Sequence, residues 1–229
     1  MKKKVAIFDI DGTIFRSSLL IELTDALIQE GIFSQRVGKE YARSYKNWLD
    51  RKDVYDKYVR GVVVAFEGHI KGVKEKDFLR VAETVAAFHR NRMYRYTREM
   101  VKDLKKKGYF LLAISHSPEV MVNAFCRKLG FDKVYGRIYE VDSRGRLTGR
   151  TIEEEVISDK SKMLKHAIRK RNLTLKGSLG VGDSESDIRF LRMVEKPICF
   201  NPNSKLYAHA KRAGWKIVVE RKDVIYTIE

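Results

Sequence analysis

The sequence predicts an α/β protein whose core is a doubly wound parallel (Rossmann-like) sheet, with an inserted helical cap domain. Three observations predict this fold. A short apolar run ends at Asp9, a long helical region follows it, and strands then alternate with helices from Tyr94 onward. Such alternation is typical of a parallel sheet covered by helices on both faces. We assign residues 1–14 and 90–229 to the core and residues 15–89 to the cap.

The first half of the chain predicts one strand and several helices. Residues 4–9 form a buried strand that enters a loop at Gly12. In residues 15–89, Leu20, Leu23 and Leu27 recur at three- and four-residue steps, as an amphipathic helix requires. Further glycines divide the rest of this region into three or four more helices.

The second half carries alternating signals. We expect Thr97 to cap a helix that ends at Gly108, and Ser117 to cap another that ends at Gly130. Residues 142–145 predict the turn of a hairpin. The other elements are predicted as strands over 109–114, 179–182 and 198–200, a final strand over 215–219, and helices over 160–171, 187–193 and 204–213.

The composition is that of a globular protein. The 229 residues are 44% hydrophobic, which argues against disorder. The apolar runs are far too short to span a bilayer, and no long uncharged stretch suggests a signal peptide, so we expect a cytoplasmic protein. Cys126 and Cys199 have no metal-ligand spacing and are expected to be reduced and buried.

The formal net charge of +17 is unusual. It favours anionic partners, such as phosphorylated metabolites, nucleic acid or acidic lipid head groups. The basic residues are dense in residues 36–60 and 90–107, which are helical in character, rather than in a tail. A solvated helical surface is the simpler interpretation, so a nucleic-acid partner stays open but is not favoured.

Polar side chains follow three of the predicted strands, at Asp9, Ser115 and Asp183. The carboxyl ends of parallel strands line the ligand crevice of an open sheet. Acids gathered there are costly unless a hard cation such as Mg²⁺ neutralises them. Asp9 and Asp183 could each supply a carboxylate oxygen to Mg²⁺, and Asp11 its backbone carbonyl.

A phosphate beside such a metal would give these residues distinct roles. Asp9 could attack phosphorus and form an aspartyl-phosphate, which splits the transfer into two steps. Asp11 could protonate the leaving oxygen and then deprotonate the attacking water. Ser115 precedes a helix start and suits a phosphate oxygen. The cation that offsets developing charge is best placed at Lys160, with Lys162 as the open alternative.

These residues resemble a known family. Residues 8–14, Ser115, Lys160 and residues 182–187 are similar, in type and order, to the four motifs of the haloacid dehalogenase-like hydrolases. Segments 145–149, 201–203 and 214–215 resemble its phosphoserine-phosphatase-like (subclass IB) branch. The resemblance covers residues 1–14 and about 90–220, which is most of the chain outside the helical insertion.

The resemblance implies a role for each matched position. Asp9 would be the nucleophile and Asp11 the acid and base, and both would bind the metal together with Asp183. Asp187 would support the lysine or the metal. The phosphate would be held by Gly12, Thr13, Ser115, His116 and Lys160.

The resemblance also implies that the cap closes over the substrate and selects it. In phosphoserine phosphatases an acid reads the substrate amine at the position that Ser18 occupies here, and the nearest acid downstream is Glu22. Residues 115–117 also lack the double glycine typical of those enzymes. Both departures argue against phosphoserine as the substrate.

We therefore expect a Mg²⁺-dependent phosphatase that hydrolyses a small phosphomonoester through a phospho-aspartate on Asp9. A phosphotransferase that passes the same phosphoryl group to an alcohol is the first alternative. A basic nucleic-acid-binding protein is less favoured, and a carbon–halogen hydrolase has no use for Asp11 or a metal. The sequence leaves the phosphoester and the oligomeric state open.

Overall fold

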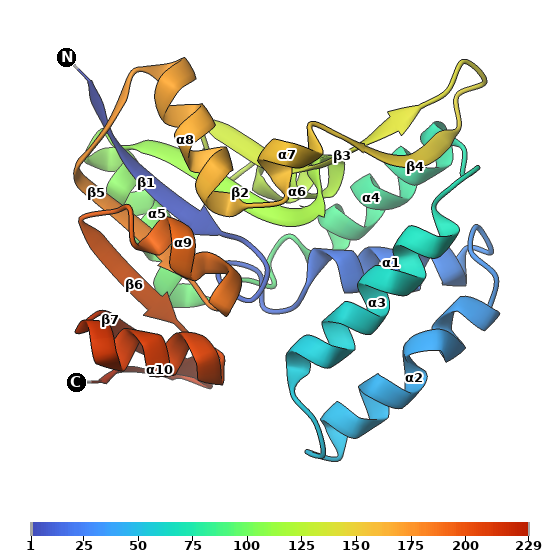
Figure 1. Cartoon of the computed structure of the whole chain (residues 1–229), viewed down its shortest axis with the longest axis horizontal. Coiled ribbons are helices and arrows are strands. Elements are labelled where there is room, and N and C mark those ends of the chain that lie inside the picture. The colour runs from blue at the N-terminus through green and yellow to red at the C-terminus, as the bar shows by residue number, and fades with distance from the viewer. Residues whose placement is uncertain (1, 229) are drawn as a thin grey trace.

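The molecule is built on an eight-stranded sheet with the order β4-β3-β2-β1-β5-β6-β7-β8 (Figure 1). A computed structural model describes residues 2–228. Six strands run parallel, and two antiparallel strands form the edges. The parallel strands are β1 (Lys3–Asp9), β2 (Phe110–Pro118), β3 (Lys133–Val141), β5 (Leu173–Gly182), β6 (Lys196–Phe200) and β7 (Lys216–Arg221), and the edges are β4 (Leu147–Ile152) and β8 (Val224–Ile228).

The order of the strands places a crevice at the carboxyl end of β1. The chain passes from β1 to β2 and β3 on one side, then returns to β5 on the other side of β1. In open α/β sheets, ligands bind where the direction of winding reverses in this way. The predicted doubly wound sheet is confirmed.

Helices cover both faces of the sheet. Successive residues of β1 point to opposite sides, and the residues on both sides are apolar and buried. Ala6 and Phe8 pack with α5 (Arg95–Lys106) and α6 (Glu119–Cys126). Val5 and Ile7 pack on the opposite face. That face is covered by α8 (Lys160–Arg171), α9 (Ile188–Leu191) and α10 (Ser204–Ala213), while α7 (Glu154–Ile157) and the short 3₁₀ turn η1 (Glu185–Asp187) complete the connections.

Two predicted helix caps are wrong. Helix α5 begins at Arg95, so Thr97 lies within it; the buried Thr97 hydroxyl donates a hydrogen bond to the Thr13 carbonyl oxygen at 2.8 Å. This side chain ties α5 to the loop after β1 instead of capping the helix. Helix α6 begins at Glu119, one residue later than a cap at Ser117 implies.

The expectation that residues 215–219 form the final strand is also wrong, because β7 turns back into β8. The turn contains Lys222, whose φ of 51° is left-handed. Glycine or asparagine usually marks such a position, so a lysine gives no turn signal. The hairpin joins β3 to β4 as predicted, and the predicted bounds of α8 and α10 are confirmed. Helix α6 ends at Cys126, before the predicted Gly130, and β5 begins at Leu173, before the predicted residue 179.

Two expectations from composition have counterparts in the structure. Cys126 and Cys199 are both free and buried, as predicted. Within residues 2–228, no helix is long and apolar enough to cross a membrane.

The insertion between β1 and α5 is helical, as predicted. It contains α1 (Leu19–Gln29), α2 (Arg36–Leu49), α3 (Tyr55–His69) and α4 (Glu75–His89). Helices α1 and α4 pack against α6 of the core, whereas α2 lies on the outer side of α3 (Figure 1). Buried residues of these helices share one apolar cluster with a face of the sheet. The assignment of residues 15–89 as a separate cap domain stays a prediction.

The loop between α3 and α4 is bonded to the β3–β4 hairpin through its backbone. The Gly72 amide donates to the Leu147 carbonyl at 2.8 Å, and the Leu147 amide to the Val73 carbonyl at 2.9 Å. The Glu75 amide donates to the Gly145 carbonyl at 2.9 Å. The insertion is therefore attached to the core at this loop as well as at its two ends.

A close backbone approach makes Gly136 of β3 a stability determinant. A Cβ atom there would lie 2.6 Å from the Glu119 Cα and 2.8 Å from the Ser117 carbonyl oxygen. We expect Gly136→Ala to lower the free energy of unfolding by about 1–3 kcal/mol, because backbone must shift to make room. Urea denaturation measures this change.

Gly68 of α3 is the matched control. A Cβ there meets nothing within 4 Å. Gly68→Ala should leave stability unchanged or raise it by up to about 1 kcal/mol, since alanine is the better helix former. Equal losses in the two variants would contradict the role given to Gly136.

Candidate active site

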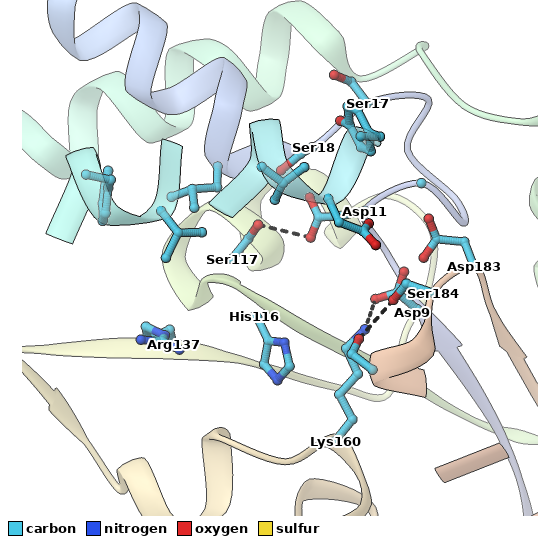
Figure 2. A pocket seen from close by; sticks show the side chains of 18 of the residues that line it. Asp9, Asp11, Ser17, Ser18, His116, Ser117, Arg137, Lys160, Asp183 and Ser184 are labelled. Carbon is cyan, nitrogen blue, oxygen red and sulfur yellow. Dashed lines mark hydrogen bonds and ion pairs between the residues drawn. The ribbon is translucent and has the colours of Figure 1, made fainter. Parts of the chain in front are cut away.

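A cavity of about 190 Å³ lies at the carboxyl edge of the sheet, beneath α3. Six of the nine predicted site residues line it, namely Asp9, Asp11, Gly12, His116, Lys160 and Asp183, whereas Thr13, Ser115 and Asp187 are not among its lining residues. Figure 2 shows Asp9, Lys160 and Asp183 close together at one end, with His116 and Arg137 along the cavity from them. The cavity is smaller than the roughly 300–1,000 Å³ typical of drug-sized ligand sites, a size that suits a small molecule.

Lys160 lies at the centre of a buried ion-pair network. Its Nζ donates to Asp9 Oδ1 and to Asp187 Oδ1, each at 2.5 Å. The three side chains are almost inaccessible, with 4%, 2% and 0% of their surface exposed. Lys162 is exposed on the same helix. Of the two lysines that the sequence left open, the structure places Lys160 beside the acids.

Burial and charge shift the pKa values at this centre. Burial alone would lower the pKa of Lys160, but Asp187 and Asp9 raise it above its ordinary value, so the lysine is a cation. Burial raises the pKa of Asp9 to about 7 even though Lys160 opposes the shift. Burial, with Asp9 and Asp187 nearby, raises the pKa of Asp183 as well. One lysine is therefore too little positive charge for the three acids.

Asp187 holds both the lysine and the turn that follows β5. While its Oδ1 accepts from Lys160, its Oδ2 accepts from the backbone amides of Asp183 at 2.9 Å and Ser184 at 3.0 Å. Both oxygens of Asp187 are thus engaged, one by the lysine and the other by the turn. This turn fixes where the carboxylate of Asp183 stands.

Asp11 connects the sheet to the first helix of the insertion. Its Oδ1 accepts from the Leu19 amide at 2.5 Å, and its Oδ2 accepts from the hydroxyls of Ser115 at 2.6 Å and Ser117 at 2.9 Å. Ser115 is fully buried. The sequence predicted Ser117 only as a helix cap and missed its place in the wall of the cavity. The two-residue spacing that puts Ser115 and Ser117 on one face of a strand could have revealed it.

Gly12 and Thr13 shape the loop over the acids. Gly12 has a φ of 78°, and a Cβ atom there would collide with the carboxylate of Asp183. Its amide donates to the carbonyls of Phe15 and Ser17. The buried Thr13 hydroxyl donates to Asp9 Oδ2 at 2.9 Å. These contacts hold the loop against both carboxylates.

His116 lines the cavity next to Lys160 (Figure 2). Burial, and then the charge of Lys160, lower its pKa to about 4, so the ring is neutral near pH 7. Its Nε2 is buried without a hydrogen-bond partner within residues 2–228. Buried polar atoms are rarely left unpaired in native structures, so this nitrogen is available to a group that enters the cavity.

The acids can hold a hard divalent cation. Asp9, Asp183 and Asp187 each offer an oxygen, and these atoms lie within 4.8 Å of one another. Asp9 and Asp183 line the cavity, whereas Asp187 is not among its lining residues, so Asp9 and Asp183 are the carboxylates suited to this role. In the part of the chain that the structure describes, no hydrogen bond is donated to the Asp183 carboxylate. Carboxylate and carbonyl oxygens are the ligands that Mg²⁺ prefers.

Ser18 and Glu22 differ in their relation to the cavity. Ser18 lines it, whereas Glu22 pairs with Arg92 at 2.7 Å and with His89 at 3.1 Å. The nearest acid downstream is therefore occupied elsewhere. Sequence reasoning also missed Arg137 and Tyr139 of β3 and the side chains of α3, because no local signal shows which element covers a strand end.

The chain matches the haloacid dehalogenase-like hydrolase family over residues 6–192. It belongs to this family, as its motifs indicated. The chain is accordingly an enzyme of the hydrolase class.

Two named relatives are phosphatases. The histidinol-phosphatase of Neisseria meningitidis serogroup C (strain 8013) is 25% identical over 232 residues, which cover 94% of this chain and 98% of the relative. The phosphoserine phosphatase of Methanocaldococcus jannaschii is 25% identical over 225 residues, which cover 97% of this chain and 95% of the relative. The names of both relatives are consistent with phosphomonoester hydrolysis as the activity of this chain.

A solved structure shares the fold. It is described as a phospho-aspartyl intermediate analogue of phosphoserine phosphatase, with a TM-score of 0.63 and 21% sequence identity. The match covers 97% of this chain and 96% of that chain. At this identity the likeness concerns the fold alone.

The Lys160 network predicts a large stability effect. Lys160→Met keeps the length of the side chain but leaves Asp9 and Asp187 buried without their cation. Removing one partner of a buried ion pair costs about 3–5 kcal/mol. We expect a loss of this size in urea denaturation, measured in the presence of a chelator so that no metal replaces the lysine.

Lys162→Met is the matched control on the same helix. Because Lys162 is exposed, the change should alter stability by less than about 0.5 kcal/mol. A similar free energy of unfolding for the two variants would contradict the stabilising role proposed for the Lys160 ion-pair network.

Proposed function

We propose that this protein is a Mg²⁺-dependent phosphatase that hydrolyses a small phosphomonoester through a phospho-aspartate on Asp9. The observation that carries the proposal is the buried contact of Asp9 with Lys160 at the carboxyl edge of the sheet. Both residues line a small cavity that Asp183 also lines. The family and the named phosphatase relatives support it.

Asp9 is held for attack by two contacts. Lys160 and Thr13 each donate to one of its oxygens, so the carboxylate has a fixed orientation. In the first step an Asp9 oxygen forms a bond to phosphorus while the bond from phosphorus to the ester oxygen breaks. An ammonium group has three donors, and Lys160 uses two of them on Asp9 and Asp187, so the third can bind a phosphate oxygen.

Asp9, Asp183 and the backbone carbonyl of Asp11 are the groups that would hold Mg²⁺. Bound there, the ion would supply positive charge that offsets the acids and stabilises charge on the phosphoryl oxygens. Asp187 would act indirectly, by keeping Lys160 and the turn of Asp183 in place.

Asp11 is the proposed acid and base. It donates a proton to the leaving oxygen in the first step and accepts one from water in the second. That water forms a bond to phosphorus, the bond to Asp9 breaks, and inorganic phosphate leaves. The Leu19 amide and the hydroxyls of Ser115 and Ser117 keep the Asp11 carboxyl in position.

The other phosphate contacts are proposed for Gly12, Thr13, Ser115 and His116. His116 is the best supported of these residues, because its neutral ring lines the cavity and has an unpaired nitrogen. The hydroxyls of Thr13 and Ser115 already donate to Asp9 and Asp11, so binding phosphate would require them to exchange these bonds.

Water and an alcohol are competing acceptors for the phosphoryl group on Asp9. A hydrolase releases one inorganic phosphate per alcohol released, whereas a phosphotransferase moves phosphate onto an added alcohol. Measuring both products in the presence of glycerol separates the two.

The cytoplasmic location and the disfavoured nucleic-acid partner stay predictions.

The first activity test uses p-nitrophenyl phosphate with and without Mg²⁺. We expect the native protein to require the metal, and Asp9→Asn to lose at least about a thousandfold in kcat, because the nucleophile is removed. Acid quenching should trap a phosphoryl group on the native peptide that contains Asp9. Asp103→Asn, an exposed acid on α5, should keep full activity. Full activity of Asp9→Asn would refute the mechanism.

Asp183→Asn tests the metal site separately. Loss of one carboxylate from the proposed ligand set should raise the Mg²⁺ concentration needed for half-maximal activity by at least about tenfold. A titration of activity against Mg²⁺ measures it, with Asp103→Asn again as the control. An unchanged Mg²⁺ dependence would exclude Asp183 as a ligand.

A further inference from the structure

The cavity has an apolar wall opposite the acids. Leu20 of α1 and Val59, Val63 and Phe66 of α3 line it, joined by Tyr139 of β3. The α3 residues recur at three- and four-residue steps, so they share one face of the helix. This face is the part of the wall that a substrate's leaving group would meet once its phosphate lay against Asp9.

The charged side chains of this wall each have a hydrogen-bond partner, although within residues 2–228 only Arg137 and Glu67 form an ion pair. Arg137 donates to Glu67 Oε1 at 2.6 Å, which joins β3 to α3 across the cavity. Asp56, at the start of α3, accepts from the Asn203 side chain at 3.1 Å. Ser18 offers only a hydroxyl. Along this wall a charged leaving group would compete with these existing contacts.

We propose that the substrate is the phosphate ester of an uncharged, apolar alcohol. The inference rests on the proposed phosphatase function and names its substrate class. A single aromatic ring or a short alkyl chain fits both the small cavity and the wall formed by Val59, Val63 and Phe66. Removing such a group from water is favourable, since the wall it contacts is apolar too.

The same wall discriminates against amino-acid-like phosphoesters. A carboxylate placed there shares Arg137 with Glu67, and an ammonium group meets the Ser18 hydroxyl or acids that already accept a hydrogen bond, Asp56 from Asn203 and Glu67 from Arg137. An ion that loses its water without gaining a partner binds poorly. Specificity then comes as much from this penalty as from apolar contact.

A matched pair of substrates tests the proposal. Benzyl phosphate and phosphoserine both join the phosphate to a CH₂ group, but one has a phenyl ring where the other has an ammonium and a carboxylate. With the Mg²⁺-loaded protein we expect kcat/KM to be at least about tenfold higher for benzyl phosphate. An equal or higher value for phosphoserine would overturn the proposal.

A binding measurement separates this proposal from the proposed function. 2-Phenylethylphosphonate and 2-amino-4-phosphonobutanoate are the non-hydrolysable counterparts of the two esters, and calorimetry measures their binding without turnover. Tighter binding of the phenyl compound supports the apolar wall even if neither ester is hydrolysed, in which case only the phosphatase function fails. Tighter binding of the amino acid analogue overturns the proposal.

Neighbouring valines of α3 provide matched variants. Val63 lines the cavity, whereas Val64 is 65% exposed on the other side of the helix. Val63→Asp should lower kcat/KM for benzyl phosphate at least about tenfold, and Val64→Asp should leave it within about twofold. The smaller change Val63→Thr, which keeps the shape, should give an intermediate loss and serves if the aspartate variant misfolds. Equal activities for the variants at the two positions would overturn the assignment of this wall.

Discussion

The ion pair of Lys160 with Asp9 and Asp187 is the interaction on which the rest of the site depends. It joins α8, β1 and η1, which lie far apart in the sequence, at one buried point. Buried charges persist only when they are paired, so the same network stabilises the packing of these elements and the geometry of the site. Because the acids outnumber the lysine, the site also retains negative charge, which is what makes it suited to a cation.

The helical insertion is held to the core by contacts of two kinds. Helices α1 and α4 pack through apolar side chains into the cluster that covers one face of the sheet, and the loop after α3 is bonded to the β3–β4 hairpin. Across the cavity, α3 reaches the core through the polar pairs Glu67–Arg137 and Asp56–Asn203. Helix α3 also contacts β3 through the rings of Phe66 and Tyr139, whose centroids lie 5.8 Å apart, so its contact with the core is both polar and apolar.

The sequence predicted the acidic residues of the site better than the apolar residues of α3 that line the cavity. Asp9 and Asp183 were identifiable because each follows an apolar run, and parallel strands bring their carboxyl ends together. The choice of Lys160 over Lys162 needed the fold, since only the direction of α8 decides which lysine faces the acids. Val59 and Val63 could be assigned to a buried helix face, but periodicity does not say what that face covers. Thr97 was wrongly predicted as a helix cap, because its hydroxyl donates to the Thr13 carbonyl oxygen, which is distant in the sequence.

The charges of the surface and the residues of the wall act on different properties of a substrate. A net charge of +17 attracts any phosphoester, but this attraction depends on ionic strength and is screened over about 8 Å under physiological conditions. Phosphomonoesters carry the same phosphate group, so long-range attraction raises the rate of encounter for all of them alike. Discrimination must therefore arise where they differ, at the leaving group, and there the chain presents Val59, Val63 and Phe66. The basic exterior and the apolar wall thus fit one scheme, in which charge collects phosphoesters and the wall selects among them.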